Sequence, residues 1–486
     1  MQPTNLVFIL SDQHNRAISG CYGHPVVRTP NLDALAARGV RFTRAYCNCP
    51  ICVPSRASLA TGRYVHSLGA WDNAHPYTGA DFKSWGHRLR GAGHHVTTVG
   101  KLHYRSPDDD TGFDDQRIPM HILEGEGDLY SLIRHDMIVR PLARRRVLEA
   151  GPGESSYTTY DRAIAVEACQ WLAEEAPRHE EAWVLFVSFV TPHHPLIAPQ
   201  EFFDLYPVES VPLPAQYGRE VRPQHPVLEE IRRVNGVDDE FSETELRRAI
   251  AAYYGLCSFM DAQVGMVLGA LEKAGLGDST RVIYTSDHGD TLGDHGLWWK
   301  YTMYEGSAGV PFIMAGPDVP QGRVVPHTVS LVDCFPTVLE CVGVPLTSDD
   351  ATLPGRSLFA PARGTGADRP AFAEYHASSS CTGYFMLRGG RYKYVEYIGY
   401  PPQLFDLDDD PGELRDLAEE PGFASVLSSC AAELRQICDP VEVDRQARAA
   451  QKLKLDEHGG EAAIRALGHR ISHTPAPEDF REGMPA

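Results

Sequence analysis

Hydrophobic runs that end abruptly in polar side chains recur along this chain. Residues 5–10 (NLVFIL) lead straight into Ser11-Asp12-Gln13-His14, and the runs 95–99, 183–190 and 281–285 end in a similar way. Short apolar runs bounded by polar or turn residues predict buried strands. Because open α/β sheets place their ligands beyond the carboxyl ends of the strands, we expect these polar groups to form a site.

Helical signals alternate with the predicted strands. The capping box Ser242-x-x-Glu245 predicts a helix that continues to Ala274 and stops at Gly275. Further helices are expected from Thr29-Pro30-Asn31 to Gly39 and over 84–90 and 160–175, and further strands over 40–46 and 310–314. Strands that alternate with helices predict an α/β fold. Residues 105–160 and 196–240, rich in turn-forming residues, are expected to be insertions over one face.

The last quarter of the chain has a different pattern. Residues 345–370 are rich in Pro, Gly and Asp and predict a linker, whereas 371–410 alternate and are aromatic, which predicts a small antiparallel sheet. A helix is expected over 423–438, followed by a charged tail. We therefore predict a catalytic α/β domain over 1–370, a small sheet with a helix over 371–440, and a tail over 441–486. Such a tail is often mobile or packed on a partner subunit, so a dimer or tetramer is expected.

Composition limits the possible partners. The formal net charge of −20 disfavours nucleic acid and anionic membranes, and any anionic substrate then needs a locally positive site. The longest apolar run, 183–189, is too short to span a bilayer, and no basic segment with a long apolar stretch opens the sequence. Eleven cysteines without regular spacing fit a reducing compartment. We expect a cytoplasmic, soluble protein.

The stretch Ile51-Cys52-Val53-Pro54-Ser55-Arg56 combines a thiol with a helix start. Pro54 suits the first turn of a helix over 54–61, and Gly62 is a helix stop. Cys52 would then lie at the positive end of the helix, and Arg56 would add donors for a tetrahedral oxyanion. An ordinary buried cysteine fits this stretch equally well. The spacing Cys49-x-x-Cys52 also permits a redox pair or half of a zinc site, but no second CxxC supports this.

Polar residues after the strands offer ligands and titratable groups. Asp12, Gln13, Asp287 and His288 predict an oxygen-rich cation site with one nitrogen, which suits Ca²⁺ or Mg²⁺. Each of these residues alone is more often an ordinary turn residue. The other groups that follow this pattern are Lys101 and His103 after the second of these runs, His193 and His194 between prolines, and Lys300 after Trp298-Trp299.

These residues carry a resemblance to a known family. Cys52-Val53-Pro54-Ser55-Arg56, followed by ASLATGRY, resembles the signature of type I sulfatases, in which this cysteine is oxidised to formylglycine. The resemblance extends in order through TPNLD at 29–33, Gly100-Lys101, PHHP at 192–195, SDHG at 286–289, GDHG at 293–296 with Lys300, and LFDL at 404–407. It implies an alkaline-phosphatase-like α/β sandwich, with a large mixed sheet between helices and a smaller C-terminal antiparallel sheet.

The resemblance also implies a ligand set and a cofactor. One divalent cation, usually Ca²⁺ with Mg²⁺ or Mn²⁺ as alternatives, would be held by Asp12, Gln13, Asp287, His288 and the modified Cys52. Many sulfatases have a carboxylate at the position of Gln13 and an Asn at that of His288. The neutral Gln and His make this site less negative.

The same resemblance implies the chemistry. Arg56, Lys101 and Lys300 would bind the non-bridging oxygens of a sulfate ester, and Asn73 is a further contact. Hydrated formylglycine offers two hydroxyls, of which one attacks sulfur and the second lets sulfate leave. His193, with Lys300, would protonate the departing alcohol, and His103 would accept the proton of the second hydroxyl.

Sulfuric ester hydrolysis of a small-molecule sulfate ester is therefore the expected function, with a formylglycine-generating enzyme as a partner in maturation. The segments WDNA at 71–74 and GDTLG at 289–293 resemble the choline-sulfatase and bacterial arylsulfatase branch, although YHASSSCT at 375–382 lacks an acidic residue for a quaternary ammonium. The alternatives are a phosphonate monoester or phosphodiester hydrolase on the same site, and a binding-only relative.

Overall fold

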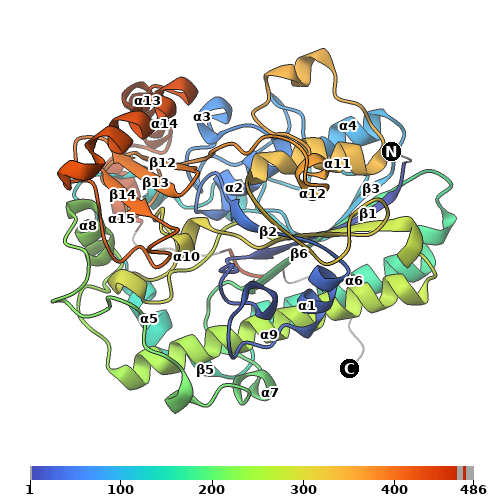
Figure 1. Cartoon of the computed structure of the whole chain (residues 1–486), viewed down its shortest axis with the longest axis horizontal. Helices are drawn as coiled ribbons and strands as arrows, with labels where there is room; N and C mark the ends of the chain where they lie inside the picture. The colour runs from blue at the N-terminus through green and yellow to red at the C-terminus, as the bar shows by residue number, and fades with distance from the viewer. Residues whose placement is uncertain (1–2, 468–473, 478–486) are drawn as a thin grey trace.

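The structure is a computed structural model that describes residues 3–467 and 474–477. Its centre is an eight-stranded mixed sheet with the order β10-β2-β9-β8-β1-β6-β3-β4 (Figure 1). The inner strands are β1 (Asn5–Asp12), β2 (Gly39–Tyr46), β3 (Val96–Lys101), β6 (Val184–Pro192), β8 (Thr280–Ser286) and β9 (Phe312–Ala315). Only β9 runs antiparallel to its neighbours in this sheet of the described chain. The predicted α/β class with a large mixed sheet is confirmed.

Helices cover both faces of this sheet, and the strands are buried on both sides. Along β1, Val7 and Ile9 face one core while Leu6, Phe8 and Leu10 face the other. The first core is closed by α1 (Pro30–Ala37), α6 (Ser156–Glu174) and α9 (Glu243–Lys273), and the second by α2 (Cys52–Thr61), α4 (Trp85–Gly91) and α11 (Cys334–Val342) (Figure 1). Burial on both faces explains why these strands read as continuous hydrophobic runs.

The helix α9 begins at the predicted capping box, because the Ser242 side chain accepts a hydrogen bond from the backbone N–H of Glu245. Among the described helices it alone has the length and hydropathy of a membrane span, yet 72% of its most apolar 18-residue window is buried inside the fold. A helix that is apolar and covered by its own chain is a core helix.

The two edge strands were not predicted individually. β4 (Asp115–Met120) lies inside the segment expected to be an insertion over one face, and instead it extends the sheet beside β3. β10 (Arg323–Ser330) closes the opposite edge beside β2. The rest of the two insertions folds into α5 (Pro141–Leu148), α7 (Gln200–Phe203), α8 (Pro226–Val234) and the short pair β5 (Gly151–Pro152) and β7 (Ile197–Ala198).

The predicted small antiparallel sheet is confirmed. It consists of β11 (Ala371–Tyr375), β12 (Tyr384–Gly389), β13 (Tyr392–Tyr397) and β14 (Gln403–Asp406), followed by α13 (Ala424–Ile437). The tail forms α14 (Pro440–Glu457) and α15 (Glu461–Ala466). It packs on its own chain, since Gln451 donates hydrogen bonds to Asp72 and to the backbone oxygen of His376. The domain limits at 370 and 440 and the oligomeric state remain predictions.

Candidate active site

The four strands predicted to end in polar groups are consecutive neighbours in the sheet. In the order β8-β1-β6-β3, the strands place Asp287, Asp12, His193 and Lys101 at their carboxyl ends, on the same side of the sheet. Residues as far apart as 13 and 287 thereby meet: the backbone N–H of Gln13 donates to Asp287 Oδ1 at 3.1 Å. The parallel arrangement of these strands therefore assembles the site.

Helix α2 brings Cys52 to this edge. Cys52 is the first helical residue, Ile51 before it is extended, and Gly62 ends the helix in the left-handed conformation at φ 68°. The Val53 backbone N–H, one of the unpaired donors of the first turn, donates to Asn73 Oδ1 at 3.2 Å. Cys52 is therefore held at the positive end of a fully buried helix. Because the carbonyl end of Asn73 is engaged, a ligand contact from Asn73 would use its amide nitrogen.

Four buried side chains meet at the helix start. One ligand atom each from Asp12, Cys52, Asp287 and His288 lies within 4.8 Å of all the others. The Sγ of Cys52 lies 3.3 Å from His288 Nε2 and 3.8 Å from Asp12 Oδ1. His288 Nδ1 donates to the Gly289 carbonyl at 3.0 Å, so its Nε2 presents a lone pair to the cluster. Two carboxylates, a lone-pair nitrogen and residue 52 form a donor set that fits a divalent cation.

Gln13 lies beside this cluster in the left-handed region, at φ 67°. Its Oε1 accepts a hydrogen bond from Lys300 Nζ at 2.7 Å, and its Nε2 donates to Asp290 Oδ2 at 2.6 Å. Asp290 was not predicted as a site residue, although it follows Asp287 by only three positions. It orients Gln13 so that the amide oxygen, a ligand that Ca²⁺ accepts, faces the ammonium of Lys300.

Arg56 contacts both predicted carboxylate ligands. Its guanidinium donates to Asp287 at 2.8 Å, to Asp12 at 3.1 Å, to the Lys101 carbonyl at 2.8 Å and to Ser188 at 3.0 Å. It is 2% exposed and lies behind the cavity wall. In this structure Arg56 positions the two carboxylates, and the expected contact to sulfate oxygens stays a prediction.

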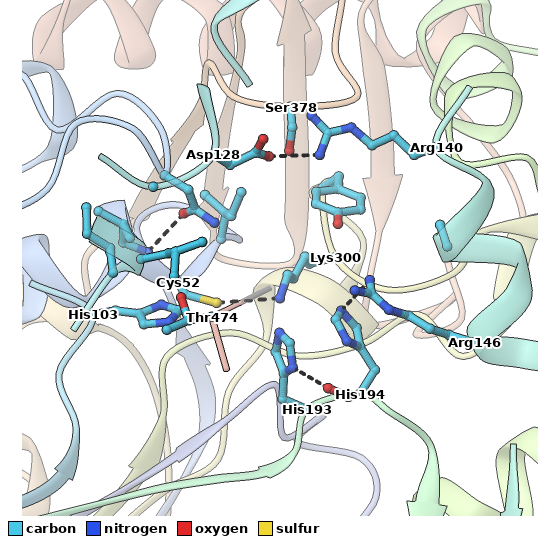
Figure 2. A pocket seen from close by; sticks show the side chains of 18 of the residues that line it. Cys52, His103, Asp128, Arg140, Arg146, His193, His194, Lys300, Ser378 and Thr474 are labelled. Carbon is cyan, nitrogen blue, oxygen red and sulfur yellow. Dashed lines mark hydrogen bonds and ion pairs between the residues drawn. The ribbon is translucent and has the colours of Figure 1, made fainter. Parts of the chain in front are cut away.

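Two lysines add positive charge at different depths. Lys101 is fully buried and forms an ion pair with Asp12 at 2.6 Å. Lys300 lines the cavity, and its Nζ lies 3.5 Å from Cys52 Sγ (Figure 2). Burial opposes the charge of Lys300, but Cys52 and Asp12 raise its pKa. Lys300, rather than Lys101, is thus the ammonium that a ligand in the cavity would meet.

A cavity open to solvent leads to Cys52 and is also lined by His103, His193 and Lys300 (Figure 2). Asn73 lines it as well. Within the described residues neither ring nitrogen of His103 has a hydrogen-bond partner, and its backbone is left-handed at φ 56°. His193 Nδ1 donates to the His194 carbonyl at 2.8 Å. Unpaired buried polar atoms and unusual backbone conformations both concentrate at functional sites.

Burial dominates the electrostatics of these groups. It raises the pKa of the Cys52 thiol to about 11, and the Asp12 carboxylate contributes in the same direction. Burial, together with the neighbouring lysines, lowers the pKa of His103 and that of His193 well below the usual value. The cations around Asp12 outweigh its burial and hold the pKa of this carboxyl low. The unmodified thiol is therefore neutral at pH 7 and a poor nucleophile.

The residues of the outer wall of the cavity were not predicted individually. Asp128, Arg140 and Arg146 come from the insertion 105–160, and Thr474 comes from the tail. The Tyr157 hydroxyl donates to the Thr474 carbonyl at 2.5 Å, which fixes the tail at the cavity. The residues around Cys52 could be found because they directly follow hydrophobic runs. The residues of the outer wall follow no such run, so this signal is missing for them.

Comparison with known proteins decides the family. The family description "Sulfatase" matches residues 4–344, which is more than half of the chain. The chain belongs to the sulfatase family. A second description, "N-sulphoglucosamine sulphohydrolase, C-terminal", matches residues 293–439. This membership confirms the predicted resemblance and makes the protein a sulfuric ester hydrolase.

Individual relatives agree with this membership. The chain is 32% identical to a choline-sulfatase of Rhizobium meliloti over 433 residues, covering 86% of this chain and 83% of the relative. It is 31% identical to arylsulfatase K of Rattus norvegicus, covering 90% and 78%. The crystal structure of the phosphonate monoester hydrolase of Agrobacterium radiobacter superposes with a TM-score of 0.71 at 26% identity, covering 91% and 96%. The alkaline-phosphatase-like fold is thereby confirmed.

Proposed function

We propose that this sulfatase cleaves small organic sulfate monoesters through a formylglycine made from Cys52. The observation that carries the proposal is the position of Cys52, at a helix start, 3.5 Å from Lys300 and within 4.8 Å of two carboxylates. A hydrated aldehyde at residue 52 would supply one hydroxyl to attack sulfur and a second whose deprotonation lets sulfate leave. A plain thiol with a raised pKa offers neither.

We propose Ca²⁺ as the cation, with Mg²⁺ and Mn²⁺ as alternatives. Asp12 and Asp287 would hold it together with His288, residue 52 and the amide oxygen of Gln13. When bound, the cation would withdraw electron density from the sulfate oxygens and from a hydroxyl on residue 52. Arg56 supports this arrangement because it orients both carboxylates from behind.

The remaining side chains suit the proton transfers that ester cleavage needs. Lys300 would bind the non-bridging oxygens of the ester, since its ammonium faces the cavity beside residue 52. With Nδ1 of His193 donating to a carbonyl, only the imidazolium form has a proton on Nε2, and this form would protonate the departing alcohol; the negative charge of a bound sulfate ester would favour it. His103 would accept the proton of the second hydroxyl at residue 52.

The modification is tested by peptide mass spectrometry at residue 52 of protein from its native host. Formylglycine lowers the peptide mass by about 18 Da relative to cysteine, and we expect that signal. An unmodified thiol in protein that nevertheless hydrolyses sulfate esters would contradict the proposed nucleophile. The expected partner in maturation is a formylglycine-generating enzyme.

A phosphonate monoester hydrolase is the second candidate, because the structure of such an enzyme superposes over 91% of this chain. A sulfate ester and a phosphonate ester that share one leaving group discriminate between the two. We expect the sulfate ester to have the higher kcat/KM. The reverse order would make phosphonate hydrolysis the principal activity.

We also propose that the protein works in the cytoplasm. All eleven cysteines are free, which is typical of a reducing compartment. Cysteine labelling of protein taken directly from the host under acid quench would detect eleven thiols, or ten with residue 52 converted. The proposed dimer or tetramer is measured on the same material by light scattering.

A further inference from the structure

Asp290 joins two parts of the site that are far apart in the sequence. Its side chain is fully buried and accepts hydrogen bonds at both oxygens. Oδ1 accepts from the backbone N–H groups of Leu292 at 2.9 Å and Trp299 at 3.0 Å, and Oδ2 accepts from Gln13 Nε2 at 2.6 Å. One carboxylate therefore holds both a candidate cation ligand and the residue directly before Lys300.

The loop 290–300, which carries Lys300, has an unusual backbone. Three of its residues are left-handed although none is glycine: Leu292, His295 and Trp299, at φ 52°, 58° and 72°. This conformation is unfavourable for bulky residues and persists only where the surrounding contacts impose it. The Trp299 carbonyl accepts a hydrogen bond from the Thr291 N–H at 2.7 Å, while the Trp299 N–H donates to Asp290. These bonds fix the strained backbone that places the Lys300 ammonium 3.5 Å from Cys52 Sγ (Figure 2).

The side-chain amide of Gln13 has one orientation between Lys300 and Asp290. An ammonium can only donate hydrogen bonds, so Lys300 Nζ faces the amide oxygen, at 2.7 Å. The amide nitrogen therefore faces Asp290 Oδ2, while Oδ1 accepts from the backbone. A carboxylate accepts at both oxygens, whereas an amide group in its place would present a donor on one side. The hydrogen bonds thus run in one direction, from Lys300 through Gln13 to Asp290.

We propose that Asp290 is a positioning residue of the reaction. Through one carboxylate it turns the amide oxygen of Gln13 toward the cation site and holds the loop 290–300 so that Lys300 lies beside residue 52. This inference rests on the proposed function, in which Gln13 holds the cation and Lys300 binds the ester. Asp290 is absent from the described residues that line the cavity, so it acts through Gln13 and Lys300. Replacing a group that orients a metal ligand commonly costs about 10- to 100-fold in cation affinity or activity.

The variant Asp290→Asn tests the direction of the hydrogen bonds. The new amide oxygen can still accept from the two backbone N–H groups, so the loop 290–300 keeps these bonds. Its NH₂ group, however, meets the NH₂ group of Gln13, which has to rotate and turn its nitrogen toward Lys300. We expect the Kd for Ca²⁺, measured by calorimetry on the metal-free full-length protein, to rise about 10- to 100-fold. With residue 52 converted, kcat/KM for nitrophenyl sulfate should fall by about the same factor.

The double variant Gln13→Glu/Asp290→Asn reverses the hydrogen bonds and keeps the summed charge of the two residues. The new amide would donate to one carboxylate oxygen at position 13, and the other oxygen would accept from Lys300. Gln13→Glu alone instead places two buried carboxylates in contact, where Gln13 Nε2 now lies 2.6 Å from Asp290 Oδ2. Each single variant should therefore lower the melting temperature of the metal-free protein and kcat/KM. The double variant should exceed both single variants in both measurements.

The matched control is Asp294→Asn, the same substitution in the same loop. Asp294 Oδ1 accepts from the Ala215 N–H at 2.7 Å, and an amide oxygen can accept in its place. This variant should keep the wild-type Ca²⁺ affinity and kcat/KM.

Two results would overturn the inference. The first is an unchanged Ca²⁺ affinity in a folded Asp290→Asn variant, and the second is a double variant that is no better than the worse single variant. The second result would mean that Asp290 serves only the fold. If Asp290→Asn does not fold by circular dichroism, the comparison of Gln13→Glu with the double variant still decides. If protein with formylglycine at residue 52 hydrolyses no sulfate ester, while the melting temperatures and Ca²⁺ affinities change as expected, the proposed function fails and the positioning role stands.

Discussion

Arg56 either positions the two buried carboxylates or binds the sulfate group of the substrate. The variant Arg56→Met distinguishes these roles, because only the first contributes to the free energy of unfolding. Arg56 gives its donors to Asp287, Asp12, Ser188 and a backbone carbonyl, and both carboxylates are fully buried. Removing one partner of a buried ion pair costs about 3–5 kcal/mol of unfolding free energy because a charge is left uncompensated. Lys101 still pairs with Asp12, so Asp287 loses most.

The assay is denaturant unfolding of the metal-free protein in EDTA, followed by fluorescence and extrapolated to water. We expect Arg56→Met to lose about 3–5 kcal/mol, and Ca²⁺ to restore part of it by neutralising the same carboxylates. The control is Arg38→Met, since Arg38 pairs with Glu272 at the surface with 42% and 54% of the side chains exposed. That change should cost no more than ~1 kcal/mol.

Unchanged stability of the metal-free Arg56→Met protein, combined with a raised KM, would refute this reasoning. It would mean that Arg56 binds the sulfate group, as the sequence suggested, and that the carboxylates do not depend on it.

Three further predictions concern the nucleophile, the cation and acid stability. Cys52→Ala should lower turnover by at least about 10³-fold while leaving the melting temperature and circular dichroism unchanged, and near-normal turnover would exclude residue 52 as the nucleophile. EDTA should abolish hydrolysis and Ca²⁺ should restore it; activity that persists in metal-free protein would remove the cation from the mechanism. Glu374→Gln should flatten the loss of stability below pH 4.5. Although burial opposes it, contacts with His66 and His376 lower the pKa of Glu374 to about 2. A carboxylate with a depressed pKa stabilises the fold above about pH 4.5 and loses that contribution, at most about 3 kcal/mol, as the pH falls toward 2. Equal slopes for the variant and the wild type in urea unfolding between pH 5 and 3 would contradict it.

The inner strands could be predicted because burial on both faces leaves continuous apolar runs. The edge strands leave no such run. β4 is intermediate in exposure along most of its length, and β10 is mostly exposed in its first half and contains Pro326, as an edge strand can. The same difference explains why residues 105–160 were predicted to be an insertion.

The site residues around Cys52 could be predicted because they lie at the ends of predicted strands. The residues of the outer wall could not be predicted in this way. Asp12, Asp287 and His193 lie where the strand pattern places them, because parallel strands align their carboxyl ends. The carboxylate contacts of Arg56 were not predicted, since a sequence shows a cation near a thiol but not which acceptors it meets. Arg140 and Arg146 take their positions from long-range packing of the insertion, which no local pattern encodes.

The burial of Cys52 would set a time limit on the proposed conversion to formylglycine. Only 2% of the side chain is exposed, and α2 packs against α11, whose last residue is Val342. At 5–20 residues per second, synthesis of the roughly 290 residues between them takes on the order of 15–60 s. During this interval the nascent chain lacks the elements that cover α2. A modifying enzyme could then still bind the segment around residue 52 as an extended peptide. Once the C-terminal half has folded, an enzyme that needs residue 52 in an extended peptide would first have to unfold α2.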